Sequence, residues 1–121
     1  MIFCDFNEFK VVNDDHGHAV GDAVLREVSL RMRRVVGPED TVGRLGGDEL
    51  VVVCVRDSVG EVEQTMAEVV ASVEAPIAAD EGFVRVSLSA GCAVALHGAH
   101  ADELLRRADA NMYDRKRARQ A

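Results

Sequence analysis

Long apolar runs, paired cysteines and an excess of basic residues are all missing from this chain of 121 residues. No stretch approaches the roughly 20 consecutive apolar residues that a membrane-spanning helix needs. Met1-Ile2-Phe3 enters an apolar segment without a basic region before it, so no signal peptide is visible and we expect a cytoplasmic protein. The formal net charge of −7 argues against a protein that binds nucleic acids or membrane surfaces through its charge.

The three cysteines exclude two further classes of protein. Cys4, Cys54 and Cys92 each lie in an apolar stretch, and their number is odd. Without paired spacing they fit neither a disulfide framework nor a zinc site. We expect all three to be small buried hydrophobic residues.

Hydrophobic periodicity predicts the order β-α-α-β-β-α-β-β-α within one domain. A capping box at Ser58 and Glu61 opens the third helix, and Pro76 marks its end. Helices this regular need a sheet to bury against, which predicts a two-layer α/β fold. The other expected elements are strands at 1–6, 41–45, 50–55, 83–88 and 92–96, a short helix or turn at 7–15, and helices at 19–36 and 102–117, with 89–91 interrupting the last two strands.

The segment Gly46-Gly47-Asp48-Glu49-Leu50 joins two apolar strands, the second of which is apolar on both faces and should be central. A glycine pair predicts a tight hairpin, because both tip positions can take positive φ, and bare backbone lets a phosphate chain come close. Two carboxylates at the rim of such a turn suit a divalent metal held against a nucleoside triphosphate. A hairpin with a solvated acidic tip would have the same local sequence.

Asp5 ends the first predicted strand. If that strand neighbours the hairpin, its carboxylate meets Asp48 and Glu49 at one edge of the sheet. Mg²⁺ takes one or two carboxylates together with waters and phosphates, and a pair of such ions can activate a hydroxyl and stabilise a leaving pyrophosphate. Spacing alone does not separate this site from simple capping, in which Asp5 caps the next helix and Asp48 caps the hairpin.

Polar residues after the first strand could complete a nucleotide site. Lys10 could reach phosphates over the same edge, although a lysine there is usually solvated surface. Asn13, His18 and Asp22 lie at the break between the first two helices, where an amide and a carboxylate could read a guanine edge. Acidic residues near a helix start are also favoured by capping and by the helix dipole.

Several stretches stand in a fixed order along the chain: 5–10 (DFNEFK), 13–14 (ND), 17–18 (GH), 21–22 (GD), 44–50 (RLGGDEL), 89–91 (SAG), 107–113 (RADANMY) and Lys116. Together they resemble the GGDEF family of diguanylate cyclases over nearly the whole chain. The resemblance implies a palm-like nucleotidyl-cyclase fold with a ferredoxin-like core, in which helices flank a central, mostly antiparallel sheet.

The resemblance also implies a role for each matching residue. Asp5 and Asp48 would bind Mg²⁺ or Mn²⁺ through their side chains and Phe6 through its carbonyl, with Glu49 assisting. Asp48 would also be the base for the 3′-hydroxyl of GTP, and Lys10 would stabilise phosphate charge in the transition state. The residues implied in GTP binding are Asn13, His18, Asp22, Gly46, Gly47 and Lys116.

The family reaction condenses two GTP molecules into cyclic di-GMP and releases two pyrophosphates. Each domain holds one GTP, so two copies must face each other as a homodimer. For residues 1–121 we expect a single GGDEF domain that lacks the usual N-terminal helix segment. The expected partners are GTP, a second copy and a sensory domain outside this chain, with no nucleic acid and no membrane segment.

The sequence departs from the family pattern at two places, one in the signature and one at a possible inhibitory site. Leu50 replaces a phenylalanine, a mild loss of volume. The Arg-x-x-Asp product-inhibition motif keeps only Asp40, because Gly37 stands where the arginine would grip a guanine edge or phosphate. We therefore predict weak or no product inhibition, with Arg34 as a partial substitute.

A third departure lies at the end of the last helix. Gln120 stands where a family arginine would contact phosphate, and the sequence assigns neither Arg117 nor Arg119 to replace it.

Two other functions stay open on the sequence alone. A regulatory module that binds GTP or dimerises without catalysis is favoured by the expected truncation. It has no need of the metal ligands, so it is opposed by the retained residues Asp5, Lys10, Asp48 and Glu49. A different palm-like nucleotide cyclase or polymerase fragment is opposed by Asn13 and Asp22, since adenine lacks the 2-amino donor of guanine.

Overall fold

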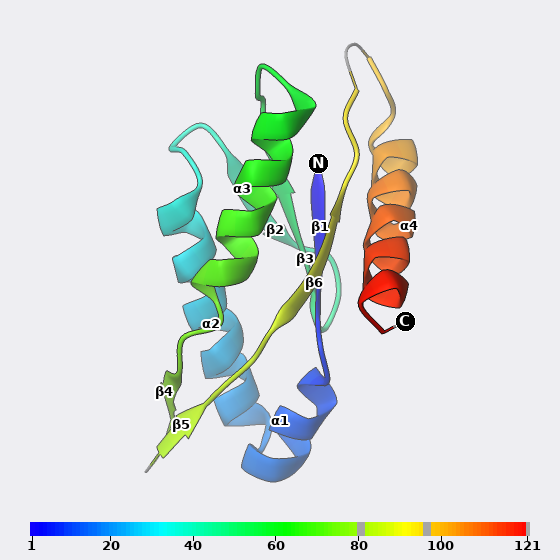
Figure 1. Ribbon diagram of the computed structural model, residues 1–121. Helices are drawn as coiled ribbons and strands as arrows, with labels where there is room; N and C mark the ends of the chain where they lie inside the picture. The colour runs from blue at the N-terminus through cyan, green and yellow to red at the C-terminus, as the bar shows by residue number, and fades with distance from the viewer. Residues whose placement is uncertain (80–81, 96–97, 121) are drawn as a thin grey trace.

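The structure is a computed structural model that describes residues 1–79, 82–95 and 98–120 (Figure 1). Its elements, in chain order, are β1 (Ile2–Phe6), α1 (Phe9–His16), α2 (His18–Val35), β2 (Thr41–Arg44), β3 (Glu49–Val53), α3 (Val59–Ser72), β4 (Ile77–Ala79), β5 (Gly82–Val84), β6 (Leu88–Cys92) and α4 (Ala101–Gln120). None of the helices in these residues is long and apolar enough to cross a bilayer.

β1 and β3 form the centre of a four-stranded antiparallel sheet with the order β2-β3-β1-β6. Both strands are buried over most of their length, as expected for segments that are apolar on both faces. The predicted central position of β3 and the predicted antiparallel sheet are confirmed. The pairing of β1 with β3 also aligns the ends of the two strands that carry the acidic residues.

The two faces of the sheet bury different helices. Ile2 and Cys4 of β1 point into the larger core, which the apolar faces of α2 and α3 complete. Phe3 points the other way and packs with Ala108 and Met112 of α4. Figure 1 shows α2 and α3 on one side of the strands and α4 on the other. The helices therefore form layers on both faces of the sheet rather than on one.

Gly91 allows α4 to lie against β6. A Cβ atom at this position would overlap the backbone of Ala108 and Met112, so only glycine fits. The sequence prediction of an interruption at 89–91 is wrong, because β6 runs straight through these residues.

The chain before and after β6 also differs from the prediction. A separate two-stranded hairpin, β4–β5, follows α3 and contains only part of the strand expected at 83–88. Residues 93–95 are not in a strand, and residue 96 of the strand expected at 92–96 lies outside the described residues.

The cysteines are less uniform than expected. Cys4 is fully buried, and burial raises the pKa of its thiol to about 12. Cys54 and Cys92 are only half-buried and pack at the margin of the larger core. All three are free thiols.

Candidate active site

An arginine holds the loop between β2 and β3. Arg44 donates from Nε to the Gly46 carbonyl and from Nη2 to the Gly47 carbonyl, both at 2.9 Å. The Leu45 amide donates to the Glu49 carbonyl at 2.9 Å and closes the turn. The predicted hairpin is confirmed, although neither glycine uses the positive φ that it could adopt. Gly47 is exposed, and a Cβ there would meet nothing within 4 Å, so its backbone is open to solvent.

The acidic residues of β1 and the hairpin meet at one edge of the sheet. Asp5 and Glu49 are direct partners in the β1–β3 ladder. The Phe6 amide donates to the Asp48 carbonyl at 3.1 Å, which continues the pairing beyond the ladder. Phe6 itself is buried and its ring packs on Phe9 at 4.8 Å, so this exit from β1 is fixed.

Asp5 is in an unfavourable electrostatic position. Its Oδ1 is buried without a hydrogen-bond partner among the described residues. Burial raises the pKa of Asp5, and the neighbouring Asp48 and Glu49 raise it further, whereas Lys116 lowers it. Capping does not explain this carboxylate, because the N-cap of α1 is Glu8. A divalent cation fits here, since it would satisfy the orphaned oxygen and neutralise the repulsion.

The part of the chain that the structure describes supplies too few ligands to enclose a metal by itself. Within the described residues, no group of three or more His, Cys, Asp or Glu side chains could hold one. Mg²⁺ is usually bound by one or two carboxylates and completed by water and substrate phosphates. Asp5 and its acidic neighbours match that incomplete type of site.

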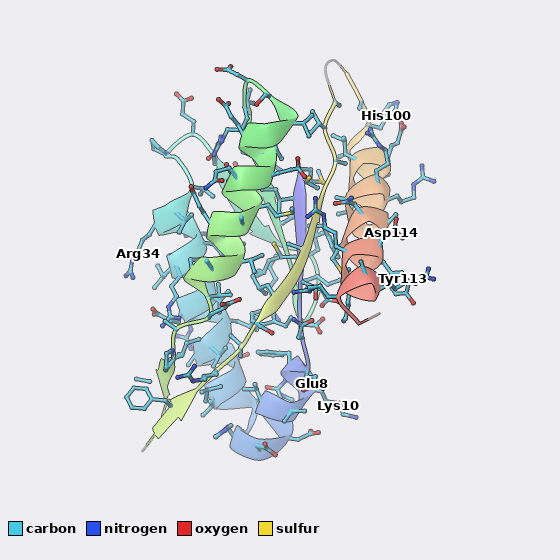
Figure 2. All side chains as sticks on the ribbon, in the orientation of Figure 1. Glu8, Lys10, Arg34, His100, Tyr113 and Asp114 are labelled. Carbon is cyan, nitrogen blue, oxygen red and sulfur yellow. The ribbon has the colours of Figure 1, made fainter. Side chains whose placement is uncertain are left out.

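A cavity of about 350 Å³ opens beside the hairpin, against α1 and α2. Its volume lies within the range of roughly 300–1,000 Å³ typical of small-molecule sites. Glu8 and Lys10 lie at the start of α1, directly after β1 (Figure 2). The cavity is lined by Phe9, Lys10, Asn13, His18, Asp22, Leu25, Arg44, Gly47 and Asp48. Most of the residues that the sequence assigned to GTP and to catalysis therefore face one space.

Gly17 and Gly21 place Asn13 at this cavity. Gly17 has φ +87° and its amide donates to the Asn13 carbonyl at 2.8 Å, which ends α1 and turns the chain into α2. A Cβ at Gly21 would collide with the Asn13 amide group. Gly21 therefore lets Asn13 lie against α2, beside the position that precedes Asp22.

Glu8 has a strained backbone at the edge of the site. Its φ of 57° and ψ of 35° place it in the left-handed region, the only non-glycine residue there among those described. Such residues cost of order 1–2 kcal/mol and often lie at functional sites. No pattern in the sequence indicated this strain.

Lys116 is not in the same cavity as Lys10. It lines a neighbouring cavity of about 420 Å³ together with Asn7, Glu8, Ser89 and Arg119. Its effect on the pKa of Asp5 shows that its charge acts on the acidic edge. The side chain of Gln120 lies outside the described residues.

The arginines near Lys116 have different surroundings. The Arg117 guanidinium lies 5.9 Å from the centre of the Tyr113 ring, whereas Arg119 donates to the buried Ser89 hydroxyl at 3.1 Å. Arg119 therefore lies at the cavity, whereas Arg117 does not line it.

Asp40 has a structural task. Arg56 donates to both of its oxygens, at 3.0 and 2.7 Å, and the Gly37 amide donates to Oδ2 at 2.7 Å. The carboxylate is only 6% exposed, and its hydrogen bonds with Arg56 hold its pKa below the ordinary value. Arg34, the suggested substitute, points outward from α2 (Figure 2).

The sequence missed several of these residues for identifiable reasons. Arg44 was in view within the signature, but its role as a clamp on the loop carbonyls depends on the shape of the turn. Arg119 lies three residues after Lys116, and helical spacing could have placed both on one face. Ser89 faces the same side of the sheet as Asp5, its partner in the β1–β6 ladder.

Comparison with known proteins gives a consistent picture. Residues 1–121 match the family described as "Diguanylate cyclase, GGDEF domain". Diguanylate cyclase TpbB of Pseudomonas aeruginosa is 40% identical over 121 residues, which cover 97% of this chain and 28% of that protein. Diguanylate cyclase DgcN of Escherichia coli is 36% identical over 121 residues, 98% of this chain and 30% of that protein. The chain thus spans less than a third of the length of these relatives.

The fold has a close match among solved structures. The crystal structure of the GGDEF domain of P. aeruginosa YfiN, also called TpbB, superimposes with a TM-score of 0.86 at 37% sequence identity, covering 99% of this chain and 75% of that one. GGDEF domains have the palm-like nucleotidyl-cyclase fold, so this match confirms the fold that the sequence resemblance implied.

Proposed function

Because the chain belongs to the family of diguanylate cyclase GGDEF domains, we propose that it condenses two GTP molecules into cyclic di-GMP and two pyrophosphates. One observation carries the proposal beyond family membership. The orphaned Asp5 carboxylate meets Glu49 at the sheet edge, next to a cavity that Lys10, Asn13 and Asp48 line together. Metal ligands, a phosphate-binding cation and a base-reading amide are thus adjacent.

The base of GTP is held at the α1–α2 end of the cavity. Asn13 offers both a donor and acceptor, and Asp22 accepts from paired N–H groups such as those of guanine. His18 adds a third polar group from the first turn of α2. The triphosphate then extends toward the hairpin, where the backbone of Gly47 is open to the cavity.

The metal would be Mg²⁺ or Mn²⁺, held by the side chains of Asp5 and Asp48 and by the carbonyl of Phe6, with Glu49 assisting. When bound, it supplies charge neutralisation and polarisation at the phosphates. The incomplete ligand set of the protein supports this assignment, because substrate oxygens are needed to complete it.

The chain's own residues then position and deprotonate. Asp48 accepts the proton of the 3′-hydroxyl of one GTP, and the 3′-oxygen attacks the α-phosphorus of the GTP held by a second copy. The new O3′–P bond forms as the bond to pyrophosphate breaks. Lys10 and Lys116 offset the negative charge on the phosphates. The reciprocal step closes the ring and releases the second pyrophosphate, so catalysis requires a homodimer.

One assay tests the proposal. The chain is incubated with GTP and Mg²⁺, and the products are separated, with parallel reactions for Asp48→Asn and for Asp114→Asn. Asp114 is an exposed carboxylate on α4 that lines neither cavity of the site, and it serves as the matched control (Figure 2). We expect cyclic di-GMP and pyrophosphate from the wild type and from Asp114→Asn, and a loss of at least about 100-fold in Asp48→Asn.

The same assay separates the alternative function. Because the relatives are longer, it is repeated with an N-terminally extended version of the chain. GTP binding without turnover in both lengths would identify a regulatory module that binds nucleotide but does not catalyse. Turnover that survives Asp48→Asn would reject the assigned roles.

A further inference from the structure

A hydrogen-bonded network connects the exit of β1 to the end of α4. The Asn7 amide donates from Nδ2 to the Ser87 hydroxyl at 2.9 Å. The Ser89 hydroxyl donates to Asn7 Oδ1 at 2.7 Å. Arg119 donates from Nη2 to the same Ser89 oxygen at 3.1 Å. Each side chain thus restrains the next, from the metal-binding strand to the last helix.

Ser89 is the central member of this network. It is 1% exposed, one of the few buried polar side chains among the described residues. Its single donor goes to Asn7 and its oxygen accepts from Arg119, so its hydroxyl orientation is fixed by both partners. Of the three linked side chains only Ser89 is buried, and its two hydrogen bonds restrain the half-buried Asn7 and the exposed Arg119.

Among the basic residues around Arg119, only Arg115 forms an ion pair within the described residues, so Arg119 is not neutralised by a carboxylate of its own. Arg115 pairs with Glu63 at 2.9 Å and Arg117 lies over Tyr113. Lys116 and Arg119 are the cations that line the 420 Å³ cavity in the described part of the chain, and Glu8 is its one acidic residue. The guanidinium has five N–H donors, and the network uses one of them, which leaves a face free for an anion.

We propose that Ser89 is a positioning residue which fixes the Arg119 guanidinium beside Lys116, and that Arg119 held in this way binds the phosphates of the nucleotide. The inference rests on the proposed function and deepens it, because it assigns a phosphate contact to a residue that the family pattern does not mark. It also connects the metal edge to the phosphate cation, since Asn7 lies two residues after Asp5 on the same exit from β1.

Binding of GTP and of guanosine, each measured by calorimetry, tests the role of Arg119. Guanosine has the base but no phosphates, so it reports on the Asn13 and Asp22 end alone. Arg119→Ala should weaken GTP binding about tenfold, the value of one hydrogen bond to a charged group, and leave guanosine unchanged. Arg117→Ala removes the same charge two residues earlier on α4 and should change neither GTP binding nor guanosine binding.

A double-mutant cycle tests the role of Ser89. Ser89→Ala should weaken GTP binding several-fold in the wild type and have no further effect when Arg119 is already alanine. It should raise KM for GTP with little change in kcat. An equal effect of Ser89→Ala in both backgrounds, or weakened guanosine binding, would mean that Ser89 is only structural and would overturn the proposal.

The outcomes distinguish this inference from the proposed function. If the wild type binds neither GTP nor guanosine, both fail. If GTP binds and is turned over but Arg119→Ala has no effect on its affinity, only the inference about Arg119 and Ser89 fails.

Discussion

Asp5 lies directly across the β1–β3 ladder from Glu49, and its buried Oδ1 has no hydrogen-bond partner among the described residues. Two like charges are therefore held together by backbone pairing, in a place where side-chain forces alone would separate them. The apo protein should be less stable for this, since like charges and desolvation both penalise the ionised form.

Asp5→Asn should make the metal-free chain more stable by about 1 kcal/mol at neutral pH, because it removes a buried charge. The same change should abolish stabilisation by Mg²⁺ with GTP. Urea denaturation with and without these ligands measures both effects. A variant that is less stable than the wild type without metal would contradict the repulsion argued here.

The Asp5 site should also give a particular pH dependence. The pKa of Asp5 in the folded state is raised above the ordinary 3.8. Between these two pKa values, the folded state therefore binds a proton that the unfolded state has lost. Stability from this group therefore falls as pH rises from about 4 through the raised pKa. The difference in unfolding free energy between wild type and Asp5→Asn, measured across this window, should grow with pH; a constant difference would count against it.

The pair of Asp40 and Arg56 should act in the opposite sense. The pKa of Asp40 is lowered by its hydrogen bonds, so the pair stabilises the fold above the ordinary carboxylate pKa and loses this effect as pH falls through the lowered value. Asp40→Ala should lower the free energy of unfolding by about 2 kcal/mol at pH 7. When Arg56 is already alanine, Asp40→Ala should cause little further loss. Additive losses would show that the two residues do not act as a pair.

Cyclic di-GMP should inhibit the protein weakly or not at all through the Asp40 site. Both oxygens of Asp40 are engaged, and Gly37 supplies a backbone amide where an arginine fork would be needed. Initial rates of pyrophosphate release should stay constant with added micromolar product. Inhibition that is lost in Arg34→Ala, a variant that leaves the Asp40–Arg56 pair intact, would refute this prediction.

Glu8→Gly should stabilise the chain by roughly 0.5–1 kcal/mol, because glycine adopts the left-handed conformation without a Cβ clash and this gain exceeds its entropic cost. Glu8→Ala keeps the clash and serves as the control, so thermal unfolding should show no gain for it. Destabilisation by glycine would show that the Glu8 side chain itself holds the start of α1.

The sequence predicted the parts of the site that depend on strand pairing and missed those that depend on helix approach. Asp5 and Glu49 could be aligned because both strands are apolar, and the acidic residue stands near the end of β1 and at the start of β3. Gly91 was taken for a break, because the sequence does not show that a helix backbone would occupy the space of its missing side chain. Arg119 was left unassigned for a similar reason, since its partner Ser89 lies 30 residues away.

The Asn13 amide fills the space that a side chain at position 21 would need, so substitutions at the two positions depend on each other. Any side chain at 21 must displace the amide at 13, so a lineage that loses the glycine also loses the placement of the base-reading group. The reverse change is milder, because shortening residue 13 leaves a gap that a larger residue at 21 can fill. We therefore expect substitutions in descendants of this chain to occur first at 13 and only then at 21.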